Sequence, residues 1–97
     1  MSSTSVVEDS VLLQHAAGLH ARPAVTLTKL AKTFGARIHI AASAGGPWID
    51  AKSVVKVMGM KTPTQTRLHV RAEGSDAAAA VAAVVKLVND DFTGGPA

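Results

Sequence analysis

The chain has 97 residues, a mass of 9.9 kDa and a formal net charge of +3. This length favours a single domain with one hydrophobic core. Because there is no cysteine, a disulfide framework, a thiolate metal site and a thiol nucleophile are all excluded. Aromatic residues make up only 3% of the chain, and Ala and Val dominate its apolar residues. We therefore expect elements that pack closely through small side chains.

No apolar run approaches the roughly 20 residues that a membrane span requires. The first residues also lack the basic region and apolar stretch of a secretory signal. A soluble, cytoplasmic protein without membrane association is the simplest expectation. Within the chain, residues 6–92 are predicted to form the domain, and residues 1–5 and 93–97 are predicted to be tails.

The charges are distributed unevenly along the chain. Between His20 and Arg71 there are nine Lys or Arg residues and a single acidic residue, Asp50. Such an imbalance is typical of proteins that bind an acidic protein, a phosphate or a nucleic acid. An ordinary solvated surface is the alternative explanation.

The first half of the chain is predicted to form a strand, a helix and a second strand. Residues 10–13 are predicted to lie in the first strand, which begins near residue 6. Helical spacing of apolar residues then predicts a helix over residues 21–34, which opens with Pro23 and is stopped by Gly35. Alternation over residues 37–41 predicts the second strand. In the predicted helix over residues 21–34, the apolar stripe consists of Ala24, Leu27, Ala31 and Phe34.

The second half is predicted to begin with a turn at residues 44–47 and a short strand at 48–50. A short helix over residues 53–60 and an alternating strand over 66–73 follow. Ser75 is predicted to cap a last helix that runs to about residue 91. Its buried stripe would consist of Ala77, Val81, Val84 and Val88.

The predicted order is therefore β-α-β-β-α-β-α. With strands this short, an antiparallel or mixed sheet covered on one face by helices is the economical α+β arrangement. The other face of the sheet would then carry a group of basic and histidine side chains: Arg37, His39, Arg67, His69 and Arg71.

The segment Gly18-Leu19-His20-Ala21-Arg22-Pro23-Ala24 places a histidine and an arginine where the first helix begins. A helix N-terminus has free N–H groups and a positive dipole end, and both favour an anion. Arg22 adds a multidentate cation suited to phosphate. A neutral imidazole can accept a phosphoryl group on a ring nitrogen and release it again. The alternative is that His20 is a capping or surface residue.

This segment resembles the active-site signature of HPr, the histidine-containing phosphocarrier family of the phosphoenolpyruvate-dependent phosphotransferase system. Ala51-Lys52-Ser53 resembles the family's second signature, and Ala72-Glu73-Gly74 and the following helix also agree. The resemblance covers residues 6–92. It implies an open-faced β-sandwich, in which three helices cover one face of a four-stranded antiparallel sheet.

The resemblance also implies a function. Phospho-enzyme I would phosphorylate His20 on Nδ1, Arg22 would steady the phosphoryl group, and an enzyme IIA would receive it during sugar uptake. The chain would be a monomeric carrier and not an enzyme, without cofactor or metal. Ser53 matches the serine modified by an HPr kinase/phosphorylase; from the residues alone it is predicted to be an ordinary N-cap serine of the short helix.

Partner docking is the last property that the resemblance implies. The family's exposed apolar patch beside the active site corresponds to Val54, Val55 and Met58. Three lysines, Lys29, Lys52 and Lys56, are candidates for the basic rim of this patch, where they would favour acidic partners.

The chain departs from the family pattern at three places. Ala17 stands where the family usually has asparagine, so polar support of the histidine would be absent. Lys61 replaces a usual glycine after the second helix, which affects the expected end of that helix. Extra residues lengthen the turn at 44–47.

Two alternatives remain at this stage. A nucleic-acid-binding module would use Arg37, Arg67 and Arg71 on the open sheet face. Such a face normally stacks bases on aromatic rings, but only Trp48 would be available, since Phe34 and Phe92 are predicted to be buried. The second alternative is a regulatory or dihydroxyacetone-kinase branch of phosphoryl transfer. The other histidines, His15, His39 and His69, fit no metal pattern, although His15 could touch the site.

Overall fold

The computed structural model describes residues 6–16 and 18–93. The predicted tail at 1–5, most of the tail at 93–97, and the departure at Ala17 therefore lie outside the described residues. The elements follow the predicted order, and their bounds are β1 (Val6–Leu13), α1 (Ala21–Ala31), β2 (Arg37–Ala41), β3 (Ile49–Asp50), α2 (Val54–Gly59), β4 (Thr66–Glu73) and α3 (Ala77–Asn89).

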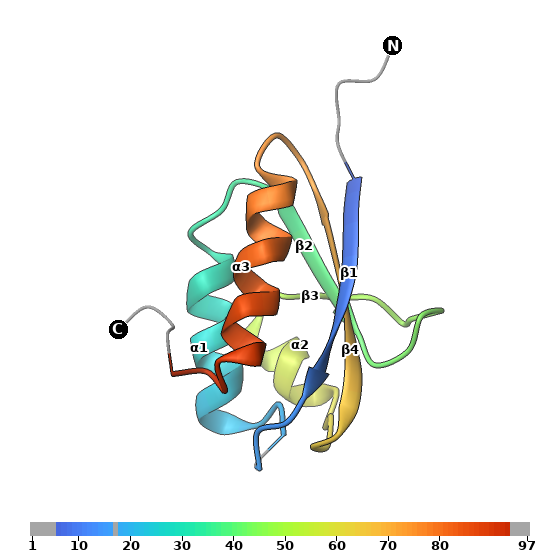
Figure 1. Ribbon diagram of the computed structural model, residues 1–97, viewed down its shortest axis with the longest axis vertical. Coiled ribbons are helices and arrows are strands. Elements are labelled where there is room, and N and C mark those ends of the chain that lie inside the picture. Colours follow the sequence, from blue (N-terminus) through green and yellow to red (C-terminus); the bar gives the residue numbers. More distant parts are fainter. Residues whose placement is uncertain (1–5, 17, 94–97) are drawn as a thin grey trace.

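The four strands form one antiparallel sheet in the order β1-β4-β2-β3. All three helices lie on one face of this sheet and leave the other face open (Figure 1). The predicted α+β open-faced sandwich is thus confirmed. In the register of β1 on β4, Val6 lies opposite Glu73 at one end and Leu13 opposite Thr66 at the other. The second of these ends leads directly into the loop that precedes α1.

Small residues allow neighbouring segments of the chain to approach closely. Gly74 has a φ of +141°, and a Cβ atom there would lie 3.0 Å from the Cα of Ala36. The stripe predicted for α3 is confirmed, and two further residues, Ala80 and Leu87, join it in the core. Phe34 and Phe92 are half-buried at the margin of the core, so they are less buried than predicted. Among the described residues no helix has the length and apolar character to cross a membrane.

The start of α3 differs from the prediction, and the residue at its N-cap position also binds the α1–β2 connection. Asp76, and not Ser75, occupies the N-cap position of α3, and its side chain does not cap the helix. Its carboxylate instead accepts hydrogen bonds from the N–H groups of Gly35 and Ala36 at 2.9 and 2.8 Å. This long-range contact holds the end of the α1–β2 loop. Sequence periodicity had predicted that α1 extends to Phe34, directly before these two residues.

α1 ends at Ala31 and not at Phe34, and β3 begins at Ile49 and not at Trp48. After Ala31 the chain continues in tighter turns, because the N–H groups of Thr33 and Phe34 bond to carbonyl groups three residues earlier. Trp48 lies outside β3, and its ring stacks on the guanidinium of Arg71 at 4.2 Å. The tertiary partner of Trp48 therefore lies on a different strand.

Candidate functional site

The loop before α1 is clamped against the segment that follows α2. Gly18 has a φ of +67°, and a Cβ atom there would overlap the carbonyl oxygen of Thr62. The next residue, Leu19, is fully buried and donates its N–H to the same carbonyl at 3.0 Å. Glycine at this position therefore permits an approach of the two segments that any side chain would prevent. Because of this clamp, His20 starts α1 from a fixed position.

His20 is the N-cap residue of α1 and has an extended backbone, with φ −129° and ψ 157°. Its side chain is exposed and makes no capping hydrogen bond, so the imidazole is open to a partner. The next residue, Ala21, has a φ of +35°, which is a costly conformation for alanine. The first N–H groups of a helix have no partner within it. The N–H groups of Ala21 and Arg22 can therefore serve an anion bound at His20.

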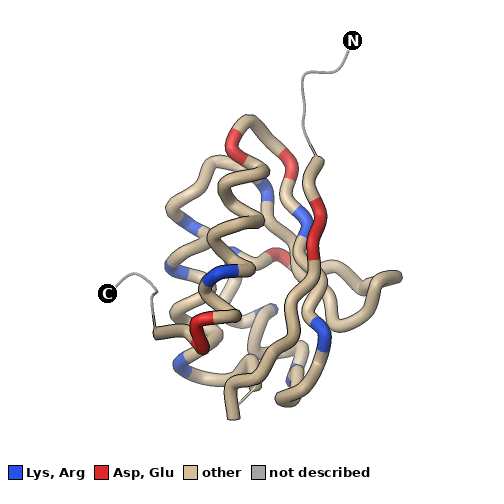
Figure 2. Tube along the Cα trace, viewed as in Figure 1, with Lys and Arg blue, Asp and Glu red and all other residues tan. Residues whose placement is uncertain are grey.

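Arg22 lies in the first turn of α1 and is exposed. Among the described residues its guanidinium has no ion pair or hydrogen bond. It is therefore free to bind a phosphoryl oxygen. α1 carries basic residues and no acidic ones (Figure 2). The site consists of an exposed histidine, a helix N-terminus and one arginine. Such a site binds an anion much more weakly than a deep cationic pocket does.

A hollow of about 310 Å³ lies beside His20 and is lined by Leu19, His20, Lys61, Thr62 and Pro63. Sequence reasoning missed this hollow and noted Lys61 only as a departure at a helix end. Lys61 has a φ of +52°, and its side chain is exposed. The hydroxyl of Thr62 is buried and has no hydrogen-bond partner among the described residues. Lys61 and His20 therefore line the same hollow.

Ser53 is the N-cap residue of α2, as predicted, and its Oγ accepts a hydrogen bond of 3.3 Å from the N–H of Lys56. On the same helix Val55 is 77% exposed, while Val54 and Met58 are half-buried against the core. These residues form one short surface, which we call the α2 surface.

Two of the predicted rim lysines, Lys52 and Lys56, differ in their surroundings. The Nζ of Lys52 donates a hydrogen bond of 2.8 Å to the carbonyl oxygen of Phe34, so this lysine holds the turn after α1. Lys56 is exposed, and its ammonium has no partner among the described residues. Lys56 is therefore the lysine with a charge available to a partner. An exposed apolar residue of α1, Val25, was not predicted, although it lies outside the buried stripe of that helix.

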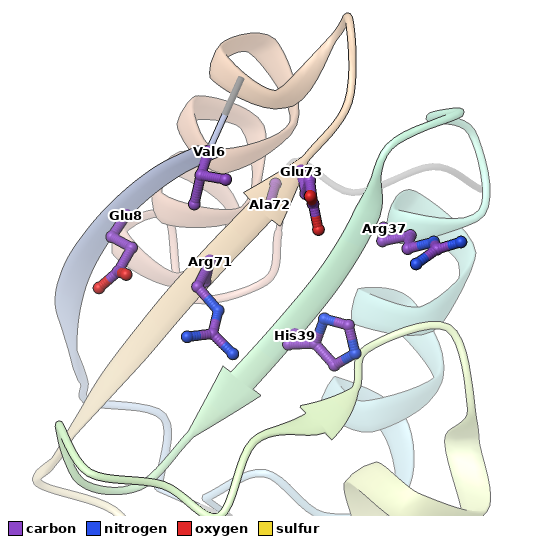
Figure 3. Close-up of a pocket in the computed structure, with 7 residues that line it drawn as sticks. All are labelled: Val6, Glu8, Arg37, His39, Arg71, Ala72 and Glu73. Carbon is purple, nitrogen blue, oxygen red and sulfur yellow. The ribbon is translucent and has the colours of Figure 1, made fainter. Parts of the chain in front are cut away.

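The open sheet face carries the predicted arginines and histidines, but acidic residues lie among them. A hollow of about 290 Å³ on this face contains both Arg37 and Arg71, together with Glu8 and Glu73 (Figure 3). The ring of Trp48, which a base would need for stacking, is already covered by Arg71. This mixture of charges is unfavourable for a polyanion and weakens the nucleic-acid alternative.

His15 lies on the loop before α1 and packs against a residue that follows α3. Its ring packs edge-on against that of Phe92, with centroids 5.7 Å apart and an interplanar angle of 81°. This contact joins the loop before α1 to the residues after α3.

Comparison with known proteins agrees with the geometry. Residues 7–90 match the family model described as the PTS HPr component phosphorylation site. The chain is 36% identical over 81 residues to the phosphocarrier protein HPr of Mycoplasma capricolum, covering 84% of this chain and 89% of the relative. It is 30% identical over 86 residues to the phosphocarrier protein NPr of Escherichia coli K12, covering 89% and 94%.

Solved structures show the same similarity. The fold matches HPr from Thermoanaerobacter tengcongensis with a TM-score of 0.82 at 28% identity, covering 89% of this chain and 94% of that one. It also matches the histidine-containing phosphocarrier protein of a mycoplasma with a TM-score of 0.77 at 32% identity, covering 92% and 100%. The chain therefore belongs to the HPr family of phosphocarrier proteins of the phosphotransferase system.

Proposed function

We propose that this chain accepts a phosphoryl group from phospho-enzyme I on Nδ1 of His20 and passes it to an enzyme IIA in sugar uptake. The observation that supports this proposal best is the exposed, uncapped imidazole of His20 at the start of α1. In the accepting step the lone pair of Nδ1 forms a bond to phosphorus. The bond between phosphorus and the donor atom breaks, and its electron pair stays on the donor. The second transfer reverses these roles at His20.

The open site suits a carrier and not an enzyme with its own turnover. Each additional 1.4 kcal/mol of stabilisation of the phosphorylated form would shift the transfer equilibrium about tenfold and retain the group. The N–H groups at the start of α1 and the guanidinium of Arg22 supply moderate stabilisation in contact with water. The α2 surface, with Lys56 beside it, would dock acidic partners in turn.

The proposed carrier function predicts that the chain takes up label from phosphoenolpyruvate only when enzyme I is present. One phosphoryl group per chain is expected, and it should be labile in acid and stable in base, as a phosphoimidazole is. Mass spectrometry gives the stoichiometry, and nitrogen–phosphorus coupling in NMR spectra identifies Nδ1. Failure to label, or an acid-stable product, would contradict the carrier function.

Ser53 is proposed as a regulatory site for an HPr kinase/phosphorylase. A phosphate there adds a charge of about −1.5 to −2 beside the α2 surface. The variant Ser53→Asp should therefore accept phosphate from enzyme I roughly fivefold more slowly, as expected for about 1 kcal/mol of repulsion. The measurement is the initial rate at low salt.

Ser53→Asn is the matched control, because asparagine caps a helix N-terminus as well as aspartate does but carries no charge. It should react at the wild-type rate. Equal rates for Ser53→Asp and Ser53→Asn would rule out electrostatic regulation at this position.

A further inference from the structure

Lys61 has a backbone conformation that a lysine adopts only at a cost. It follows Met60, the C-cap residue of α2, and its φ of +52° lies in the left-handed region. Glycine is the residue that usually occupies this position after a helix, because it has no Cβ atom. Stabilisation of the helix end does not require a lysine here, since Lys56 already places a positive charge in the last turn of α2. The side chain of Lys61 therefore needs another explanation.

The fold holds Lys61 next to His20. Leu19 precedes His20 in the chain, and Thr62 follows Lys61. The N–H of Leu19 donates a hydrogen bond of 3.0 Å to the carbonyl oxygen of Thr62. Gly18 lies so close to Thr62 that no side chain fits between the two segments. His20 and Lys61 then line the same hollow, whose other lining residues carry no charge.

The ammonium of Lys61 is available to a ligand. The side chain is exposed and has no ion pair or hydrogen bond within residues 6–16 and 18–93. Between His20 and Arg71 the single acidic residue is Asp50, and one of its oxygens already accepts the N–H of Lys52. A dianionic phosphoryl group on His20 would therefore be a suitable counter-charge for Lys61.

From these observations we propose that Lys61 is a second phosphoryl-binding cation, which stabilises the phosphorylated form of His20 from the side of the hollow. This role rests on the proposed carrier function and deepens it. Arg22 would bind the phosphoryl group from α1, and Lys61 would bind it from the turn after α2. The second cation makes this chain a better acceptor and a weaker donor of phosphate, so it sets the position of the transfer equilibrium.

The test is the equilibrium ratio of phosphorylated to free chain at fixed phosphoenolpyruvate, pyruvate and enzyme I. Lys61→Gln removes the charge and keeps the strained backbone, whereas Lys61→Gly removes both. Each should lower the ratio about 3- to 10-fold at low salt, and the difference from wild type should shrink at about 1 M salt. Lys61→Arg should retain a ratio close to that of wild type.

Lys32→Gln is the charge-matched control, because this exposed lysine lies at the other end of α1, about 18 Å along the helix from His20. It should leave the ratio unchanged. If the wild-type chain labels but Lys61→Gln leaves the ratio unchanged, the role of Lys61 is overturned and the carrier function stands. The same holds if Lys32→Gln lowers the ratio as much as Lys61→Gln does. A wild-type chain that does not label would overturn the carrier function and, with it, this role.

Discussion

The variant His20→Ala should accept no phosphoryl group from enzyme I while it keeps the wild-type fold. Loss of the only proposed nucleophile should lower the rate of transfer about 10³-fold or more, which is background in a labelling assay. The fold should survive, because the imidazole is exposed and makes no capping hydrogen bond. The free energy of unfolding should change by no more than about 0.5 kcal/mol. Labelling and chemical denaturation measure the two effects.

His69→Ala is the matched control for this prediction. His69 belongs to β4, and its side chain is half-buried on the open sheet face, away from the helices. This variant should label as the wild type does. Label that persists in His20→Ala would show that another residue carries the phosphoryl group. Loss of label in a folded His69→Ala chain would indicate that the open face takes part in the transfer.

Local periodicity was sufficient to predict the long strands and the character of each helix. The alternation in β4 and the stripe of α3 depend on neighbouring residues only, because each pattern repeats within one element. The N-cap role of Ser53 was predictable for the same reason, since the hydroxyl bonds to an N–H three residues later. His20 and Arg22 were placed correctly at a helix start by their own segment.

Three of the features that sequence reasoning missed depend on residues far apart in the chain. The carboxylate of Asp76 could have capped α3, but it binds the loop before β2 instead. Lys52 was predicted to be a rim lysine, but its ammonium holds the carbonyl of Phe34. The proximity of Lys61 to His20 requires the contact between two loops, one that follows β1 and one that precedes β4. No periodic pattern within a single element predicts such contacts.

The contact between these loops also explains the second large effect, which we expect for Gly18→Ala. An L-residue at a φ of +67° loses about 1–2 kcal/mol, and the new Cβ atom would overlap the carbonyl oxygen of Thr62. This oxygen belongs to the backbone, so it cannot rotate away as a side chain would. The free energy of unfolding should fall by about 2–4 kcal/mol, measured by chemical denaturation. Transfer should also slow, because His20 and Lys61 would move apart.

Gly45→Ala is the control that isolates the contact, because an added Cβ atom there has no neighbour within 4 Å. The two variants remove the same unfolded-state freedom, so the difference between them reports the folded state alone. Gly45→Ala should change stability by no more than about 1 kcal/mol and leave transfer unchanged. If Gly18→Ala were as stable as Gly45→Ala, the two loops would not be clamped. The positions that we infer for His20 and Lys61 would then lose their structural basis.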